Sequence, residues 1–440
     1  MDLTIEKLVY GGDGLARLPA DERGRGKAAF VPFVLEGETV EAMLLEQKPG
    51  FARARADQIV AASPQRIEPR CPYFQRCGGC HYQHTSYEHQ LEIKAAILNE
   101  NLRRIAKVEL DIELKVHPSP PWNYRNRTRL KVQGVPEFAL GYYRLNSHEL
   151  LPVEECPISS PLINRAIAAM WRLGHAGKVP TAIREIEVFV NADDTQLLAE
   201  GFCSSDITGS AEQFAADLRT ALPETCGVVF FEGRSGRGES RGDPQRLTVS
   251  GTDYLTYTTE TYTTELAYYR VSAGAFFQVN RHLTDKLLNT VVRGRHAGGT
   301  GTALDLYAGV GFFSSVLNRE FERVIAVEPS PTSHADLLYN SPANVKAIRA
   351  TTEQYLENAA GKLHPELVVV DPPRSGLGER VIQGLANLRA ARLVYVSCDP
   401  ATLSRDLARL LQLGYRIEQA DLVDLFPQTY HLESVFHLVR

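Results

Sequence analysis

The first two stretches of the chain differ in their patterns of apolar and polar residues. Residues 1–62 contain short segments of strand composition, such as 28–34 and 38–42, and glycine-containing turns. This pattern predicts a small β-barrel of the OB-like type. Residues 63–265 mix a stretch with helical spacing at 84–105 with strand-like runs, which predicts an α+β domain.

From residue 266 to residue 440, continuous apolar runs alternate with helical patterns. The runs are 302–306, 324–327, 367–370 and 393–396. Continuous apolar strands between helices are typical of a parallel, doubly wound sheet, so this stretch predicts a Rossmann-like domain. The chain closes with another predicted strand at 433–439. Before this domain, residues 233–246 are rich in Gly, Arg and Ser and predict a mobile loop.

Composition fits this multi-domain α/β organisation. At roughly 150 residues per domain, 440 residues suggest about three domains. The net charge of −5 excludes a protein that coats nucleic acid by overall charge, but it allows local basic patches. No apolar run approaches the ~18 residues of a membrane helix, and the first residues do not resemble a signal peptide. We therefore expect a cytoplasmic protein that does not contact a membrane.

Two glycines follow the first strand of the predicted parallel sheet. Ligands of such sheets bind at the carboxyl ends of the strands. Gly309 and Gly311 allow a tight turn there, and Glu328 at the end of the next strand suits ribose hydroxyls. Ser314 replaces the third glycine of a dinucleotide fingerprint, which favours a ligand with ribose but no pyrophosphate. S-adenosylmethionine fits this description, and a glycine turn without a ligand is the alternative.

Two later strands also end in reactive side chains. One runs into Asp371, and the next ends at Cys398. Asp399 is a predicted helix N-cap with Pro400 as the first helical residue, so Cys398 lies beside a helix N-terminus. That position favours the thiolate. An inert buried cysteine and an ordinary turn aspartate are the alternatives.

Three of the seven cysteines cluster within ten residues. An odd number of cysteines in a long chain argues against a disulfide framework. Cys71, Cys77 and Cys80, together with the distant Cys156, supply four thiolates. Four thiolates suit either zinc or an iron–sulfur cluster, and the spacing leaves both open.

The segment from Lys115 to Arg144 combines basic and aromatic residues. Glu137 is its only acidic residue. Cations bind phosphates and aromatic rings stack on bases, so the segment is a candidate RNA-contacting surface. A solvated strand face is the alternative.

In their order along the chain, several motifs resemble those of the S-adenosylmethionine-dependent RNA 5-methyluridine methyltransferases, in the branch with an iron–sulfur cluster and an N-terminal TRAM domain. The resemblance covers nearly the whole chain. The motifs are Cys71-x5-Cys77-Gly78-Gly79-Cys80 with Cys156-Pro157, Phe276-Phe277-Gln278-Val279-Asn280, residues 304–311, Asp371-Pro372-Pro373-Arg374, Val396-Ser397-Cys398-Asp399-Pro400, and Phe426-Pro427-Gln428-Thr429 with His431-Leu432-Glu433.

The resemblance implies a role for each matching residue. Cys398 would be the nucleophile and Glu433 the general base. The cofactor S-adenosylmethionine would contact Gln278, Tyr307, Glu328 and Asp371 around the glycine turn, with Asn340 as a further contact. The four clustered cysteines would hold a 4Fe-4S cluster, and residues 1–62 would be a TRAM domain. One departure is Phe312, where the family often has a polar asparagine.

The resemblance also implies a substrate. The branch points to 23S ribosomal RNA, and some relatives act on the T-loop uridine of transfer RNA. Other hypotheses are an adenine amino-methyltransferase, which would need no cysteine nucleophile, and a non-catalytic iron–sulfur RNA-binding protein. We expect domains at 1–62, 63–265 and 266–440, and a monomer.

Overall fold

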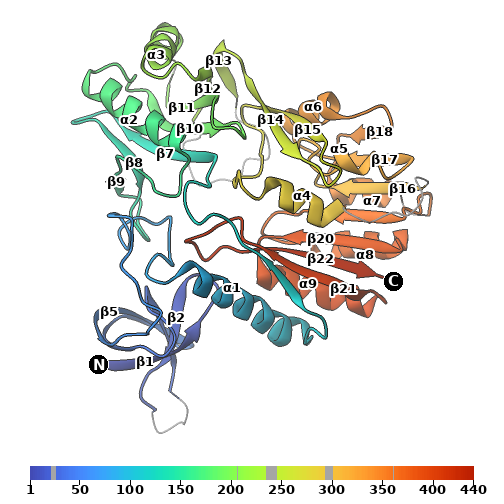
Figure 1. Ribbon diagram of the computed structural model, residues 1–440, viewed down its shortest axis with the longest axis horizontal. Coiled ribbons are helices and arrows are strands. Elements are labelled where there is room, and N and C mark those ends of the chain that lie inside the picture. Colours follow the sequence, from blue (N-terminus) through green and yellow to red (C-terminus); the bar gives the residue numbers. More distant parts are fainter. Residues whose placement is uncertain (21–25, 206, 234–244, 293–300, 360) are drawn as a thin grey trace.

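The computed structural model describes the whole chain except residues 21–25, 206, 234–244, 293–300 and 360. Figure 1 shows an N-terminal barrel at lower left, a central sheet at upper left and a C-terminal α/β unit on the right. The glycine-rich stretch 233–246, for which the sequence predicts a mobile loop, lies mostly outside the described residues.

The N-terminal strands form a closed barrel in the order β1-β2-β3-β5-β4. They are β1 (Asp2–Leu8), β2 (Asp13–Arg17), β3 (Ala28–Pro32), β4 (Thr39–Gln47) and β5 (Phe51–Ala61). Alternate residues of β1, including Leu3 and Ile5, point into the barrel core and are fully buried. The predicted small β-barrel is confirmed.

The central part is a seven-stranded sheet in the order β13-β12-β11-β10-β7-β8-β9. Its strands are β7 (Arg127–Gln133), β8 (Ala139–Tyr143), β9 (Leu150–Pro152), β10 (Ile183–Val190), β11 (Leu197–Cys203), β12 (Thr225–Glu232) and β13 (Arg246–Gly251). Helices α2 (Pro161–His175) and α3 (Thr208–Ala221) pack on it through one apolar cluster. A separate hairpin of β14 (Tyr254–Glu260) and β15 (Leu266–Ser272) follows.

The C-terminal sheet has eight strands in the order β18-β17-β16-β19-β20-β22-β21-β6. They are β16 (Thr302–Leu306), β17 (Arg323–Val327), β18 (Val345–Ile348), β19 (Leu367–Val370), β20 (Arg392–Ser397), β21 (Arg416–Val423), β22 (Glu433–Val439) and β6 (Leu114–His117). Strands β16 to β20 are mutually parallel, and β22 runs antiparallel between β20 and β21. The predicted doubly wound sheet is confirmed.

Helices cover both faces of this sheet, because its strands are apolar on both sides. The helices are α4 (Thr284–Val292), α5 (Ser314–Leu317), α6 (Pro331–Asn340), α7 (Thr352–Ala359), α8 (Gly378–Leu388) and α9 (Pro400–Gln412). Along β17, Val324 and Ala326 join one apolar cluster, whereas Ile325 and Val327 join the other. In the described residues no helix is long and apolar enough to cross a membrane.

Two elements from the middle of the sequence belong to the C-terminal sheet. Helix α1 (Tyr87–Asn101) continues into the short π-helix η1 (Leu102–Ala106), and both pack against α9. Strand β6 extends the sheet by pairing with β21 in parallel. Both elements fall within residues 63–265, which we expected to form a separate central domain. A local sequence pattern predicts that a segment is a helix or a strand, but not which of two sheets a strand joins or a helix packs beside.

Candidate active site and cysteine pocket

The candidate catalytic residues meet at the carboxyl edge of the C-terminal sheet. Asp371 directly follows β19, and Cys398 directly follows β20. Strand β22 is antiparallel, so its first residue, Glu433, lies at the same edge. The ladder pairs Ser397 with Ser434, which places Cys398 and Glu433 side by side across the two strands.

Contacts from three directions hold the backbone around Cys398. Before it, the Ser434 hydroxyl donates to the Ser397 carbonyl over 3.2 Å. After it, Asp399 caps α9, accepting hydrogen bonds from the backbone N–H groups of Ala401 at 3.0 Å and Thr402 at 2.9 Å. The carbonyl of Cys398 itself accepts a hydrogen bond of 3.1 Å from the hydroxyl of Tyr10, which belongs to the barrel. The predicted N-cap at Asp399 is confirmed.

Burial dominates the electrostatics of this edge. Burial, followed by the carboxylates of Glu433 and Asp371, raises the pKa of Cys398 to about 12. The expectation that Cys398 favours the thiolate is therefore wrong for the protein alone, because burial and two acidic neighbours outweigh the adjacent helix N-terminus. Burial, followed by Asp371, also raises the pKa of Glu433 well above its ordinary value.

Asp371 and Arg374 are two further ionisable groups of this site. Burial, followed by the Asp305 carboxylate, raises the pKa of Asp371 to about 7. The guanidinium of Arg374 acts in the opposite direction and lowers the pKa of both Cys398 and Glu433. The described part of the site therefore places three acidic groups near one cation.

The glycine turn after β16 has the geometry that the sequence predicts. Gly311 has φ +90°, and a Cβ there would lie 2.8 Å from the side chain of Leu337. Gly309 has φ +56°, and a Cβ there would meet no atom within 4 Å, so this residue borders open space. Tyr307 also has a positive φ of 65° and redirects the chain at the strand end.

Glu328 joins this turn to the loop after β17. Its two carboxylate oxygens accept hydrogen bonds from the backbone N–H groups of Gly309 at 2.9 Å and Ser330 at 2.7 Å. The Glu328 carboxylate therefore lies directly beside the glycine turn at the carboxyl edge of the sheet. The turn and the acidic residue are thus brought together as a ribose site requires.

Other predicted contacts have structural partners. The Asn340 side chain accepts from the Arg270 N–H at 2.8 Å and donates to the carbonyls of Arg270 and Val310, so it braces the glycine turn. The ring of Phe312 is buried against other aromatic rings, which explains how an apolar residue is accommodated there. The backbone carbonyl of Gln278 accepts a 2.9 Å hydrogen bond from Asn126.

From the sequence, no role was assigned to three residues at this edge, Arg374, His431 and Tyr10, although the first two belong to its motifs. Arg374 is part of the Asp-Pro-Pro-Arg motif, so the motif was a signal for it. Its Nη2 lies 3.5 Å from Nδ1 of His431, whose pKa burial lowers to about 3, so this imidazole is neutral. Tyr10 lies 388 positions before Cys398 in a β-barrel turn, and no local pattern indicated it.

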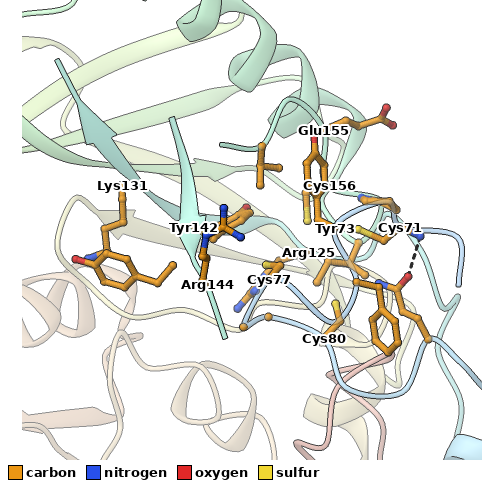
Figure 2. A pocket seen from close by; sticks show the side chains of 18 of the residues that line it. Cys71, Tyr73, Cys77, Cys80, Arg125, Lys131, Tyr142, Arg144, Glu155 and Cys156 are labelled. Atoms are coloured by element: carbon orange, nitrogen blue, oxygen red, sulfur yellow. Dashed lines mark hydrogen bonds between the residues drawn. The ribbon is translucent and has the colours of Figure 1, made fainter. Parts of the chain in front are cut away.

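The four clustered cysteines line one pocket of about 320 Å³ in the central part. Figure 2 shows Cys71, Cys77, Cys80 and Cys156 around it, with Arg125 nearby. Burial is the main cause that raises the pKa of Cys77 to about 11, and the neighbouring cysteines add to it. Nevertheless, among the residues that the structure describes, no three His, Cys, Asp or Glu side chains are placed to hold a metal ion.

The basic segment 115–144 is largely neutralised in the fold. Arg129 contacts Glu185 and Glu187 of the neighbouring strand β10, at 3.5 and 2.6 Å. Arg127 pairs with Glu187 and with Glu200 on β11. Counting charges within the segment missed these acids, which lie more than 40 positions later. The surface is less basic than expected, and its contact with RNA stays a prediction.

The strand order of the C-terminal sheet, with the turn and acidic residue at its carboxyl edge, defines the fold class of the methyltransferases. A structure of the Pyrococcus abyssi tRNA (uracil-54, C5)-methyltransferase in complex with S-adenosyl-L-homocysteine matches the whole chain with a TM-score of 0.76, at 24% identity and with 100% of each chain covered.

Sequence comparison gives the family. The model of the tRNA (uracil-5-)-methyltransferases matches residues 86–440, and the TRAM domain model matches residues 1–56. An uncharacterized RNA methyltransferase of Aquifex aeolicus is 35% identical, with 99% of this chain and 97% of that protein covered. The 23S rRNA (uracil(1939)-C(5))-methyltransferase RlmD of Pseudomonas fluorescens is 33% identical, with coverages of 98% and 92%. The chain belongs to the RNA uracil-5-methyltransferase family, a family of S-adenosylmethionine-dependent enzymes, and carries a TRAM domain.

The raised pKa of Cys398 predicts how its reactivity depends on pH. At pH 7 a thiol with a pKa of about 12 is ionised in about one molecule in 10⁵. The rate of alkylation of Cys398 by iodoacetamide should therefore rise about tenfold per pH unit from pH 7 to pH 9. Mass spectrometry of the peptide that contains Cys398 measures this rate, with free cysteine as the control. A rate that levels off below pH 8 would show that the thiolate is already formed.

Proposed function

We propose that this enzyme transfers a methyl group from S-adenosylmethionine to carbon 5 of one uridine in RNA, through a covalent adduct on Cys398. The observation that carries the proposal is the register of β20 and β22, which places a cysteine and a carboxylic acid side by side at the carboxyl edge of a methyltransferase sheet. Methylation of a carbon that is a poor nucleophile needs both groups.

The cysteine makes carbon 5 reactive. After Cys398 has lost its proton to solvent, a bond forms between Sγ and carbon 6 of uracil, and the electron pair of the C5–C6 double bond moves to carbon 5. Carbon 5 then bonds to the methyl carbon of the co-substrate, whose sulfur keeps the electron pair of the broken bond. Covalent catalysis thus divides one difficult step into easier ones.

The carboxyl group resolves the adduct. Carbon 5 still carries its original proton, which the ionised Glu433 removes. The electron pair re-forms the C5–C6 double bond, the bond between Sγ and carbon 6 breaks, and Cys398 leaves as a thiolate. The net change is one methyl group gained and one proton released.

The charges of the site suit a cationic co-substrate. Cys398, Glu433 and Asp371 are acidic groups whose buried positions disfavour their ionised forms, and Arg374 is the cation that acts on the first two. S-adenosylmethionine supplies an electrophilic methyl group on a positively charged sulfonium. We propose that Glu328 accepts hydrogen bonds from its ribose hydroxyls. Tyr307, Gly309, Gly311, Gln278 and Asp371 would form the rest of its pocket.

The choice of RNA rests on the relatives. The characterised relative at 33% identity is named for a uridine of 23S rRNA, which favours ribosomal RNA as the substrate here. The family description names transfer RNA, which keeps the T-loop uridine as the second candidate. Because either RNA is a cytoplasmic substrate, we propose that the enzyme acts in the cytoplasm, and the monomeric state stays a prediction.

We also propose that the four clustered cysteines hold a 4Fe-4S cluster with a structural role. Thiols from two distant segments surround a single pocket, although they are not arranged for one metal ion. Four thiolates bind either zinc or an iron–sulfur cluster, and the family resemblance favours the cluster. The buried Nε of Arg125 has no hydrogen-bond partner among the described residues, and its charge would offset that of the thiolates.

Mapping the modified nucleoside tests the reaction and the substrate. Cells that lack the gene should lose 5-methyluridine at one site of 23S rRNA, as measured by oligonucleotide mass spectrometry. Wild-type enzyme should restore it, and Cys398→Ala should restore none while still binding S-adenosylmethionine. Loss from transfer RNA alone would change the substrate, and full activity of Cys398→Ala would end the covalent mechanism in favour of an amino-group methyltransferase.

Replacing the base should trap the adduct. Glu433→Gln cannot remove the proton from carbon 5, so the enzyme should stay attached to the methylated RNA. Denaturing electrophoresis with labelled RNA should show a band of enzyme plus RNA. The double variant Glu433→Gln/Cys398→Ala is the control and should give no band. If the single variant also gives none, another group removes the proton.

Metal analysis tests the cluster. Protein purified without oxygen should be brown and contain about four iron and four sulfide per chain, as expected for a 4Fe-4S centre. Cys77→Ser should lose most of the iron and become less stable to heat. Cys226→Ser, at a half-buried cysteine outside the pocket, should keep it. Colourless wild-type protein with bound zinc would contradict the proposal.

A further inference from the structure

A residue of the N-terminal barrel reaches the catalytic cysteine. Tyr10 lies in the turn between β1 and β2, and its hydroxyl donates to the carbonyl oxygen of Cys398 over 3.1 Å. The edge of its ring packs on Tyr430, with 5.4 Å between the ring centroids. The TRAM barrel is therefore in direct contact with the active site.

The barrel turn that carries Tyr10 is packed closely in this position. Gly12 has φ +92°, and a Cβ there would lie 3.0 Å from the Cβ of His81 and 3.1 Å from its ring. The backbone N–H of His81 donates to the Gln428 carbonyl at 2.8 Å, and its ring lies 4.6 Å from that of Tyr430. The turn thus packs on the chain segment 428–432, which leads directly to Glu433.

The Tyr10 hydroxyl is suited to a permanent donor role. Burial, followed by the negative charge of Asp399, raises the pKa of Tyr10 above its ordinary value, so the group stays protonated. The neighbours of Cys398 are held by the β22 ladder and by the α9 cap, whereas Tyr10 contacts the carbonyl of the nucleophile itself. The N–H of the same peptide donates to Ser397 Oγ over 3.3 Å, so loss of the Tyr10 hydroxyl releases the carbonyl side of the peptide and leaves the N–H side held.

We propose that Tyr10 is a positioning residue: by fixing the Cys398 carbonyl it sets the direction in which Sγ approaches carbon 6 of uracil. The barrel then forms part of the catalytic site besides any contact with RNA. This inference rests on the proposed function. Misplacement of a reacting atom by about 1 Å can cost on the order of 100-fold in rate, so one hydrogen bond at this point can matter.

A pair of matched variants tests the proposal in the full-length protein. Tyr10→Phe removes the hydroxyl but keeps the ring on Tyr430. Tyr415→Phe is the control, because the buried Tyr415 also donates to a backbone carbonyl, that of Ala390, at 3.0 Å, but lies outside the site. Point variants are preferable to deleting residues 1–62, which would uncover the apolar groups on which the barrel packs.

Two measurements are made on wild type and both variants. The first is methyl transfer to a 23S rRNA transcript, with kcat and KM determined separately. We expect Tyr10→Phe to lower kcat about tenfold, the size of one lost hydrogen bond, and to leave both KM values within twofold. The second is alkylation of Cys398 by iodoacetamide, which needs neither RNA nor S-adenosylmethionine. We expect it to be at least threefold faster in Tyr10→Phe, because the thiol is held less firmly, and unchanged in Tyr415→Phe.

The two measurements together separate the possible failures. Unchanged kcat and unchanged alkylation in Tyr10→Phe would overturn the positioning role, as would equal changes in both variants, since these would indicate general loosening. If wild-type enzyme methylates neither 23S rRNA nor transfer RNA, the proposed function fails. In that case the ratio of the alkylation rates of Tyr10→Phe and wild type still tests whether the Tyr10 contact holds Cys398 in place.

Discussion

The antiparallel insertion of β22 into an otherwise parallel arrangement is the constraint on which the candidate active site depends. Parallel strands end at one edge of a sheet, so Asp371 and Cys398 meet there by topology. Glu433 reaches the same edge because its strand begins where the others end. A parallel β22 would place Glu433 at the opposite edge. The pairing of a cysteine with a carboxylic acid is therefore a consequence of strand direction.

The loop before β22 is held by buried polar contacts from α1. Lys94 and Asp424 form a fully buried ion pair with 2.6 Å between Nζ and Oδ1, and Lys94 also donates to the Phe426 carbonyl at 2.9 Å. Gln90 and Gln428 exchange two hydrogen bonds of 3.0 and 2.9 Å. Burying charged and polar groups carries a desolvation cost, which offsets part of the stability that these contacts provide. What they add is one defined path for the loop. The apolar residues Ile93, Ile97 and Leu98 of α1 pack in the cluster shared with the C-terminal sheet, and its polar residues hold the loop.

The same burial that fixes the geometry disfavours the ionised forms of Cys398 and Glu433 in the protein alone. The carboxylates of Glu433 and Asp371 make ionisation of the Cys398 thiol less favourable, and Asp371 does the same to Glu433, whereas Arg374 opposes these effects on Cys398 and Glu433. An acidic site of this kind favours a cationic partner. The reactivity of Cys398 is thus linked to what binds beside it, and its backbone is fixed in advance by β22, by the α9 cap and by the barrel.

The sequence by itself determined the barrel, the doubly wound sheet, the helix N-cap at Asp399 and the glycine turn at 309–311. These follow from local causes: apolar periodicity, capping chemistry and the backbone freedom of glycine. The sequence also indicated that the clustered Cys71, Cys77 and Cys80 belong together with the distant Cys156. Only the tertiary structure placed Tyr10 on Cys398, gave Arg127 and Arg129 their acidic partners, and raised the pKa of Cys398 rather than lowering it. Contacts between residues hundreds of positions apart depend on which elements pack together, and burial depends on all of them at once, so no local pattern records either.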